Sequence, residues 1–132
     1  MDLEILKIAS DTNNNKNLSS YTHFSKSKSS ICGDEIQIKL IIEKNTIIDF
    51  AYQGKSCVYC QATASILSKI SINKSKIEIN ELCNVAKSYF EENFGNINDK
   101  LFVFEKIFNR KNLARKECIL LPFKTLKKIV SK

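Results

Sequence analysis

Every second residue is apolar in two neighbouring stretches of the chain, and this alternation predicts two β-strands. Residues 34–43 would bury one face of a strand, with the side chains of Ile36, Ile38, Leu40 and Ile42. Residues 46–53 would do the same with Ile48, Phe50 and Tyr52. Lys44 and Asn45 predict a turn between them, so we expect an antiparallel hairpin that is covered on one side and ends at Gly54.

After the hairpin the spacing of apolar residues changes to about 3.6, which predicts helices. We expect the first of these helices at residues 58–71. Other segments with helical spacing are residues 2–9, 75–94, 101–108 and 120–130. Gly95 is placed to cap the helix at 75–94, and Pro122 is expected in the first turn of the last helix, just after Cys118.

The region before the hairpin is polar. Residues 11–30 are rich in Asn and Ser and predict a loop or weak edge region, with a first short strand at residues 21–24. Because strands precede the main helices, the sequence predicts an α+β fold, a small antiparallel β-sheet of about three strands with helices packed on one face. We find no internal repeat or linker and expect residues 1–132 to form a single domain, with an N-terminal helix and polar loop in residues 1–20.

The composition is typical of a globular protein and excludes several other classes. With 132 residues, 43% of them hydrophobic, the chain is long enough to bury a core without disulfides. Its apolar runs fall short of the roughly 18 residues of a membrane span, and its first residues lack the features of a signal or transit peptide. We therefore expect a cytoplasmic protein without a membrane partner.

The net charge of +7 does not by itself indicate nucleic-acid binding. Lysines are scattered along the chain, only Arg110 and Arg115 are arginine, and no basic run carries interleaved aromatic residues. We interpret the lysines near the C-terminus as the solvated face of a helix: Lys124, Lys127, Lys128 and Lys132. We expect no nucleic-acid partner, whereas the positive charge favours an acidic protein partner.

The cysteines are the main chemical signal. Five cysteines, an odd number, in a chain expected to be cytoplasmic favour metal or sulfur chemistry over disulfides. Cys32 precedes the hairpin and Cys57 follows it, so the hairpin is expected to bring them together. Cys118 lies at the start of the last expected helix, and Asp34 adds a carboxylate beside Cys32. Such a set of thiolates with one carboxylate suits tetrahedral Zn²⁺, or iron with an exchangeable position.

Other interpretations of these residues remain open. Core packing is favoured for Cys83, on the inward face of a helix, and for Cys60, one turn into another. Cys57-Val58-Tyr59-Cys60 is also a C-x-x-C motif at a helix start, which makes a dithiol oxidoreductase an alternative function. A basic binding module is a less favoured third function, and we interpret His23, the only histidine, as a bystander.

Three motifs occur in order along the chain: Cys32-Gly33-Asp34, the run from Gly54 to Ser65, and Arg115-Lys116-Glu117-Cys118. On these motifs the chain resembles the IscU/NifU N-terminal family of iron–sulfur cluster assembly proteins, over residues 21–130. The long segment between Cys57 and Cys118, and Glu117 where the IscU branch carries histidine, are similar to the SufU branch. The resemblance implies a SufE/IscU-like α+β fold.

The resemblance also implies a metal or cluster site. Its ligands would be Cys32, Asp34, Cys57 and Cys118, holding Zn²⁺ or, on the cysteines, a labile [2Fe–2S] or [4Fe–4S] cluster. Cys32 is implied as the sulfur acceptor, and Arg115 matches a basic position to which we assign an auxiliary role.

As a function, the resemblance implies either a scaffold or a zinc-dependent sulfur acceptor, and the sequence leaves both open. Such a protein takes persulfide sulfur from a cysteine desulfurase of the SufS, IscS or NifS type. It then passes the sulfur toward iron–sulfur clusters in downstream acceptor or carrier proteins. No catalytic turnover of its own is expected.

The chain departs from the family pattern in ways that bear on the site. Cys60 stands where the family usually has serine. The Asn-Pro pairs that are usual near the N-terminus and before Cys-Gly-Asp are missing. The stretches from Asn13 to Asn17 and from Ser25 to Ser30 take their places.

Overall fold

The computed structural model describes residues 3–92 and 99–132 of the chain. The elements, of which η1 and η2 are 3₁₀-helices, follow in this order: α1 (Leu3–Ala9), β1 (His23–Lys28), β2 (Glu35–Glu43), β3 (Thr46–Gln53), α2 (Val58–Ser71), α3 (Lys76–Glu92), η1 (Asp99–Phe104), η2 (Arg110–Arg115) and α4 (Lys116–Val130). The expected α+β class is confirmed.

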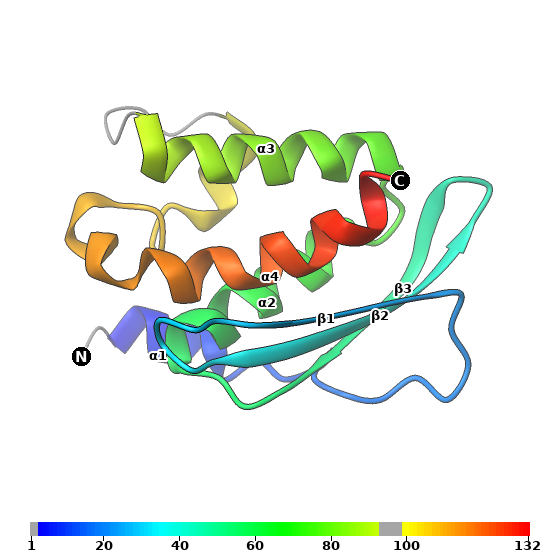
Figure 1. The fold of residues 1–132 in the computed structure, drawn as a ribbon, viewed down its shortest axis with the longest axis horizontal. Helices are drawn as coiled ribbons and strands as arrows, with labels where there is room; N and C mark the ends of the chain where they lie inside the picture. The colour runs from blue at the N-terminus through cyan, green and yellow to red at the C-terminus, as the bar shows by residue number, and fades with distance from the viewer. Residues whose placement is uncertain (1–2, 93–98) are drawn as a thin grey trace.

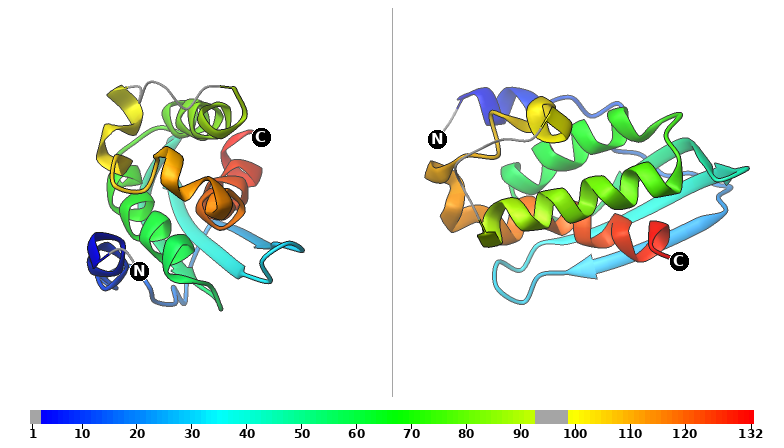
Figure 2. Two further views of the ribbon diagram at one scale, coloured as in Figure 1. Left: turned by 90° about the vertical axis from the view of Figure 1, so that its left-hand side faces the viewer. Right: turned by 90° about the horizontal axis from the view of Figure 1, so that it is seen from above.

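The molecule is built in layers, as Figures 1 and 2 show. The sheet has the order β1-β2-β3, with antiparallel pairing throughout, so β2 is central. Helices α2 and α4 pack on one face of the sheet, α2 against β3 and α4 against β1 and β2. Helix α3 packs on α4 and forms the outermost layer. One hydrophobic cluster runs between these layers and includes residues from α1 to α4.

The Asn-rich segment that precedes β1 lies along the outer edge of β3. The backbone N–H of Tyr52 donates to the carbonyl of Asn14 at 2.9 Å, and Asn15 forms a parallel bridge with Tyr52. The Asn14 amide also donates to Ser68 Oγ of α2, at 3.0 Å. These contacts cover the edge of β3, whereas β1 pairs with a strand on one side only within the described residues.

The hairpin of β2 and β3 turns where the sequence predicts. Lys44 and Asn45 have φ angles of 51° and 63°, the left-handed pair of a type I′ turn, which matches the twist of the strands. A register shift between Ile41 and Ile42 leaves Ile48 as the extra residue of a β-bulge. The prediction that Ile48 faces the core is therefore wrong: Ile48 is 43% exposed, and Ile47 is buried.

Strand β1 differs from the prediction in its position. The expected strand covered residues 21–24, with a loop beyond it, whereas the strand runs from His23 to Lys28. Its inward positions carry small polar residues, Ser25 and Ser27, and α4 packs against this strand. A search for alternating apolar residues misses such a strand because serine fills the positions that face the core.

The helices after the hairpin differ from the predicted helices mainly in the region before Cys118. Helices α1, α2 and α3 match their predicted segments within the described residues, and Gly95 lies outside those residues. The predicted helix at 101–108 is instead the 3₁₀-helix η1 followed by turns. The predicted inward residues are buried nonetheless, together with Ile107: Leu101, Phe104 and Phe108. Spacings of three residues satisfy a 3₁₀-helix, which explains the misassignment.

Helix α4 begins earlier than predicted. It starts at Lys116, so Cys118 lies within its first turn and Pro122 within its interior, where a first-turn position was expected. Proline at this position removes the N–H that would bond to the Cys118 carbonyl in a regular helix. Burial of the residues on either side, Leu121 and Phe123, holds the helix together at this point.

Within the described ranges, the structure contains no helix that is both long and apolar enough to cross a membrane.

Candidate metal centre

Three parts of the chain that carry cysteines meet at one end of the molecule. They are the loop between β1 and β2, the start of α2 and the first turn of α4, which lie together in Figure 1. Gly54 makes this meeting possible, because a Cβ there would lie 2.1 Å from the carbonyl oxygen of Glu35. The N–H of Glu35 also donates to the Lys55 carbonyl at 2.8 Å. The end of β3 is thereby held against the start of β2.

A compact group of potential ligands results. The sulfur atoms of Cys32 and Cys118 and a carboxylate oxygen of Asp34 all lie within 4.8 Å of one another. Cys32 is exposed, whereas Asp34 and Cys118 are only 7% and 3% exposed. A solvent-facing thiol thus stands over a buried thiol and a buried carboxylate.

Cys57 joins this group from the start of α2. It is the N-cap residue of α2 and is half-buried, and its thiol lies near enough to Asp34 for that carboxylate to raise its pKa. The structure therefore brings together the residues that the sequence analysis named as ligands. That they bind a metal stays a prediction.

The electrostatics of the group disfavour a cluster of bare anions. Burial raises the pKa of the Cys57 thiol above its ordinary value, and the nearby Asp34 carboxylate adds to this effect. Burial also raises the pKa of Cys118, and its hydrogen bonds to Cys32 and Cys57 raise it further. Each thiolate would be costly here unless a cation balanced its charge.

The donors present fit a bound cation. Asp34 Oδ2 is buried and has no hydrogen-bond partner within the described residues. Such an orphaned oxygen is costly without a partner, and a metal ion would supply one. Soft thiolates with a single carboxylate match the ligand preference of Zn²⁺ or iron.

Ser29 organises the loop that carries Cys32, a role that the sequence analysis missed. Its hydroxyl oxygen accepts hydrogen bonds from the N–H groups of Ile31 and Cys32, at 3.3 and 3.2 Å. Its own N–H donates to the Asp34 carbonyl at 2.8 Å, and its carbonyl accepts from Gly33 at 2.9 Å. The Ser29 side chain thus forms an ST-turn, the serine counterpart of the Asx-turn that asparagine forms. The available signal was a serine three residues before Cys32.

Arg115 lies beside the site and is not buried. Its guanidinium stands over the ring of Tyr59, 5.4 Å from the ring centroid, in a cation–π contact. This contact links the residue before α4 to the first turn of α2. The two helices that carry Cys118 and Cys57 are thus joined at their starts.

The remaining candidates lie in the core or apart from the site. Cys60 and Cys83 are buried, as predicted, and burial raises the pKa of each to about 12. A buried, protonated Cys60 does not favour the alternative of a Cys57–Cys60 dithiol oxidoreductase, because the thiolate is the reactive form. His23 begins β1, at the opposite end of the strand from the Cys32 loop, and its Nδ1 lies 2.8 Å from Thr22 Oγ1.

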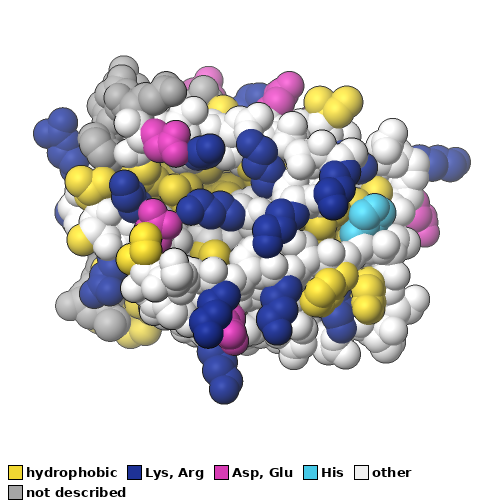
Figure 3. All heavy atoms as spheres, viewed as in Figure 1, with side chains coloured by type: hydrophobic (Ala, Val, Ile, Leu, Met, Phe, Trp, Pro, Cys, Tyr) yellow, Lys and Arg dark blue, Asp and Glu magenta, His cyan; other side chains and the backbone are white. Residues whose placement is uncertain are grey.

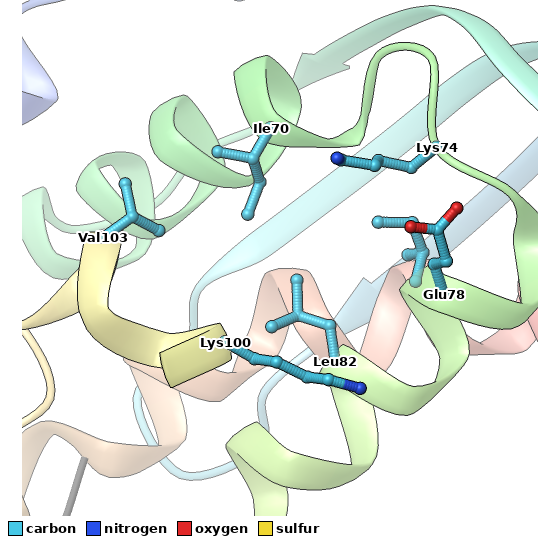
Figure 4. A pocket seen from close by; sticks show the side chains of 7 residues that line it. Ile70, Lys74, Glu78, Leu82, Lys100 and Val103 are labelled. Carbon is cyan, nitrogen blue, oxygen red and sulfur yellow. The ribbon is translucent and has the colours of Figure 1, made fainter. Parts of the chain in front are cut away.

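A pocket of about 380 Å³ lies away from the cysteines, between α2, α3 and η1 (Figure 4). Its wall combines apolar with charged side chains, among them Ile70, Leu82, Lys74, Glu78 and Lys100. Ile70 lies near the end of α2 opposite to Cys57. None of the predicted site residues lines this pocket.

The chain is thus a three-stranded α+β domain with a group of cysteine and aspartate side chains at one end that suits a metal ion. The model of the NifU-like N terminal domain matches residues 4–100, and the chain belongs to this family. The resemblance expected from the motifs is thereby confirmed.

Two curated relatives match the chain. The iron–sulfur cluster assembly scaffold protein IscU of Thermotoga maritima is 34% identical over 113 residues, which is 84% of this chain and 78% of that protein. An uncharacterized protein of Borreliella burgdorferi is 37% identical over 97 residues, 73% of this chain. The match spans 66% of the length of that second relative.

Solved structures share the fold. A SufU from Fervidobacterium islandicum, described as a candidate iron–sulfur cluster assembly scaffold protein for the SUF system, superposes with a TM-score of 0.90 at 22% identity, over 98% of this chain and 96% of that chain. The N-terminal part of a NifU-like protein from Brucella abortus gives a TM-score of 0.83 at 20% identity, over 98% and 91%. At these identities the likeness is one of fold.

Proposed function

We propose that this protein takes part in iron–sulfur cluster assembly, as a scaffold or sulfur acceptor that receives persulfide sulfur from a cysteine desulfurase. The observation that carries the proposal is the group of Cys32, Asp34 and Cys118 within 4.8 Å, beside which Cys57 lies at the start of α2. Membership of the NifU-like family supports the same function.

Cys32 is the residue we propose as sulfur acceptor, because it is the exposed thiol of the group. Its thiolate attacks the outer sulfur of the desulfurase persulfide. A new S–S bond forms on Cys32, the S–S bond of the donor breaks, and the donor cysteine leaves as a thiolate. The negative charge passes from Cys32 to the donor, so the transfer needs no oxidant or reductant.

The proposed ligands are Cys32, Asp34, Cys57 and Cys118, and the resident ion is Zn²⁺ or iron. When bound, the ion supplies the positive charge that keeps the thiols deprotonated near neutral pH. An iron–sulfur cluster, as cargo, would be held by the cysteines alone. Asp34 would be the exchangeable ligand of the ion, and it would not bind the cluster.

Arg115 is proposed as an auxiliary group. Its contact with Tyr59 fixes the start of α2 relative to the start of α4, which are the elements that carry Cys57 and Cys118. The downstream partners would be proteins that receive the cluster or its sulfur. Free cysteines throughout the chain fit a reducing compartment such as the cytoplasm, where we place this role.

The test is to quantify metal and acid-labile sulfide in anaerobically purified protein, with and without a cysteine desulfurase and cysteine. We expect about one Zn²⁺ per chain, or a labile cluster after incubation with iron. Cys32→Ser should abolish sulfur uptake, while the buried Cys83→Ser serves as the matched control. Absence of metal and cluster, together with unchanged sulfur uptake by Cys32→Ser, would contradict the proposal.

A further inference from the structure

A groove lined by lysines runs beside the candidate metal centre. It has a volume of about 370 Å³ and lies between β1 and α4. Two lysines stand on each wall, Lys26 and Lys28 from β1 and Lys124 and Lys128 from α4. We refer to these four residues and the space between them as the lysine groove. Figure 3 shows Lys and Arg side chains gathered over β1 and α4, with few acidic side chains among them.

The charge of the lysine groove is only partly balanced within the chain. Lys28 Nζ lies 3.7 Å from Glu35 Oε1, and Lys124 Nζ lies 3.1 Å from Glu117 Oε2. Lys26 and Lys128 form no ion pair with a carboxylate in the part of the chain that the structure describes. Four ammonium groups around one groove therefore favour an occupant with several negative charges.

The lysine groove leads directly to the metal centre. Ile31 and Glu117 line it, and each precedes a proposed ligand, Cys32 and Cys118 respectively. The side chain of Ile31 is 75% exposed, so it offers an apolar contact at the mouth of the site. A segment bound in the lysine groove would therefore lie next to the loop that carries Cys32.

The wall made by β1 favours an extended peptide over other anions. β1 is an edge strand, and the carbonyl of Lys26 faces α4, where it accepts a hydrogen bond from Lys128 Nζ at 2.9 Å. The outer edge of β1 has no paired strand within the described residues, so an added strand could pair there in place of the Lys128 contact. The walls contain no arginine, the side chain that best reads phosphates and bases.

We propose that the lysine groove docks an acidic, extended segment of the protein that supplies sulfur to Cys32. The docked segment brings the donor persulfide to the exposed thiol by charge pairing along β1 and α4. The identity of the partner rests on the proposed function, whereas binding of an acidic peptide does not.

The experiment compares two charge-reversal double variants of the full chain. Lys26→Glu with Lys128→Glu changes the lysine groove. Lys74→Glu with Lys87→Glu changes exposed lysines elsewhere by the same net charge. Zinc content and the far-UV circular dichroism spectrum should match wild type in both variants, which shows that the fold and the metal centre are retained.

Two readouts are measured at low ionic strength. The first is the dissociation constant of a fluorescent eight-residue Glu-Ala repeat peptide. The second is the desulfurase concentration that half-saturates sulfur uptake. We expect the groove variant to raise both by about tenfold and the control variant by less than about twofold. The rate of sulfur uptake at saturating desulfurase should stay unchanged, because Cys32 is intact.

Several results would overturn the docking proposal. If the two variants weaken peptide binding equally, the lysine groove is not a binding site for acidic segments. If the groove variant binds the peptide more weakly but its half-saturating desulfurase concentration is unchanged, the sulfur donor is not the partner of the lysine groove. Tighter binding of a DNA oligonucleotide than of the peptide would favour nucleic acid instead. If wild type takes up no sulfur, the proposed function fails, and so does the assignment of the sulfur donor as the partner.

Discussion

Cys32 is distinguished from the other thiols of the site by its exposure and by the loop that presents it. Cys57 and Cys118 are held by helices, whereas Cys32 lies in a turn whose backbone is fixed by Ser29. The proposed roles of Cys32, as metal ligand and as sulfur acceptor, both need such a position. Cys32 lies beside Asp34 and Cys118 and is also exposed to solvent.

Replacement of Ser29 tests how far this turn matters for metal binding. Ser29→Ala leaves the N–H groups of Ile31 and Cys32 without their acceptor, so the loop samples other conformations. We expect zinc affinity to fall by about tenfold, as for other residues that orient ligands. Ser29→Asn should restore most of it, since asparagine can form the same turn. Competition with a chromophoric chelator measures the affinity.

The neighbouring Ser30, which is exposed, provides the control for this substitution. Ser30→Ala should leave zinc affinity at the wild-type value. An equal loss in Ser29→Ala and Ser30→Ala would show that the hydroxyl of Ser29 does not position the ligand loop.

The thiols should also differ in reactivity toward iodoacetamide in the metal-free protein. Burial raises the pKa of Cys60 and Cys83 to about 12, so at pH 8 only about one thiol in ten thousand is ionised. We expect rapid alkylation of the exposed Cys32 and none of Cys60 or Cys83 on the same time scale. Peptide mapping by mass spectrometry reads out each site. In urea all the thiols should react, and native labelling of Cys83 would contradict its burial.

At the scale of elements, the end of β3 determines where Cys57 lies. Gly54 passes so close to Glu35 that a side chain cannot fit without moving one strand. Gly33, in the Cys32 loop, has a φ of 76°, but no atom lies within 4 Å of the position that an alanine methyl group would take there. Gly54 also has a φ of 157°, so Gly54→Ala combines a steric clash with backbone strain, whereas Gly33→Ala introduces backbone strain alone.

Gly54→Ala should destabilise the protein more than Gly33→Ala does. For Gly33→Ala we expect a loss of about 1–2 kcal/mol from the left-handed backbone alone. For Gly54→Ala the loss should exceed this, and zinc binding should weaken because the start of α2 moves away from Asp34. Urea unfolding and chelator competition provide the two measurements. Equal values for the two variants would contradict the clash at Glu35.

The elements also show what the sequence could and could not predict. The hairpin and α2 follow from clear periodicity, and with them came the proximity of Cys32, Asp34 and Cys57. β1 was placed wrongly because its inward residues are serines. The bulge at Ile48 was missed because it depends on pairing across the sheet, which no local pattern records.

The last helix likewise shows the difference between what local sequence patterns predict and what packing determines. Pro122 suggested a helix start, but burial of the surrounding apolar residues extends α4 back to Lys116. Cys118 is consequently a helical residue whose direction is fixed by the helix. The choice of ligands could be made from the motifs, whereas Ser29 and the contact of Arg115 with Tyr59 needed the three-dimensional arrangement.

For the whole molecule, the proposed ligands come from three distant parts of the chain, so a bound metal would tie the layers together. We expect excess Zn²⁺ to raise the free energy of unfolding, by about 4 kcal/mol at a thousandfold excess over the dissociation constant. Cys118→Ser should abolish most of this gain, and Cys83→Ser should retain it after its own effect on stability is subtracted. Urea titrations with and without metal measure the difference.

Metal binding should depend on pH with a defined sign. Because burial raises the pKa of Cys57 and Cys118, both thiols are protonated near neutral pH in the metal-free protein and must release protons to bind. We expect apparent zinc affinity to rise with pH between about 6 and 8, by up to about tenfold per pH unit for each proton released. Calorimetry in buffers of different ionisation enthalpy counts the protons. An affinity that does not change over this range would contradict thiol ligation.

The two edges of the sheet lead to a consequence for self-association. The outer edge of β3 is covered by the segment that includes Asn14 and Asn15. The outer edge of β1 has no paired strand in the described chain, but it carries Lys26 and Lys28 at alternate positions. Two copies that met along β1 would bring like charges together, which is how natural sheets avoid polymerisation. The same lysines that would admit an acidic strand thus keep a second copy of this chain from extending the sheet.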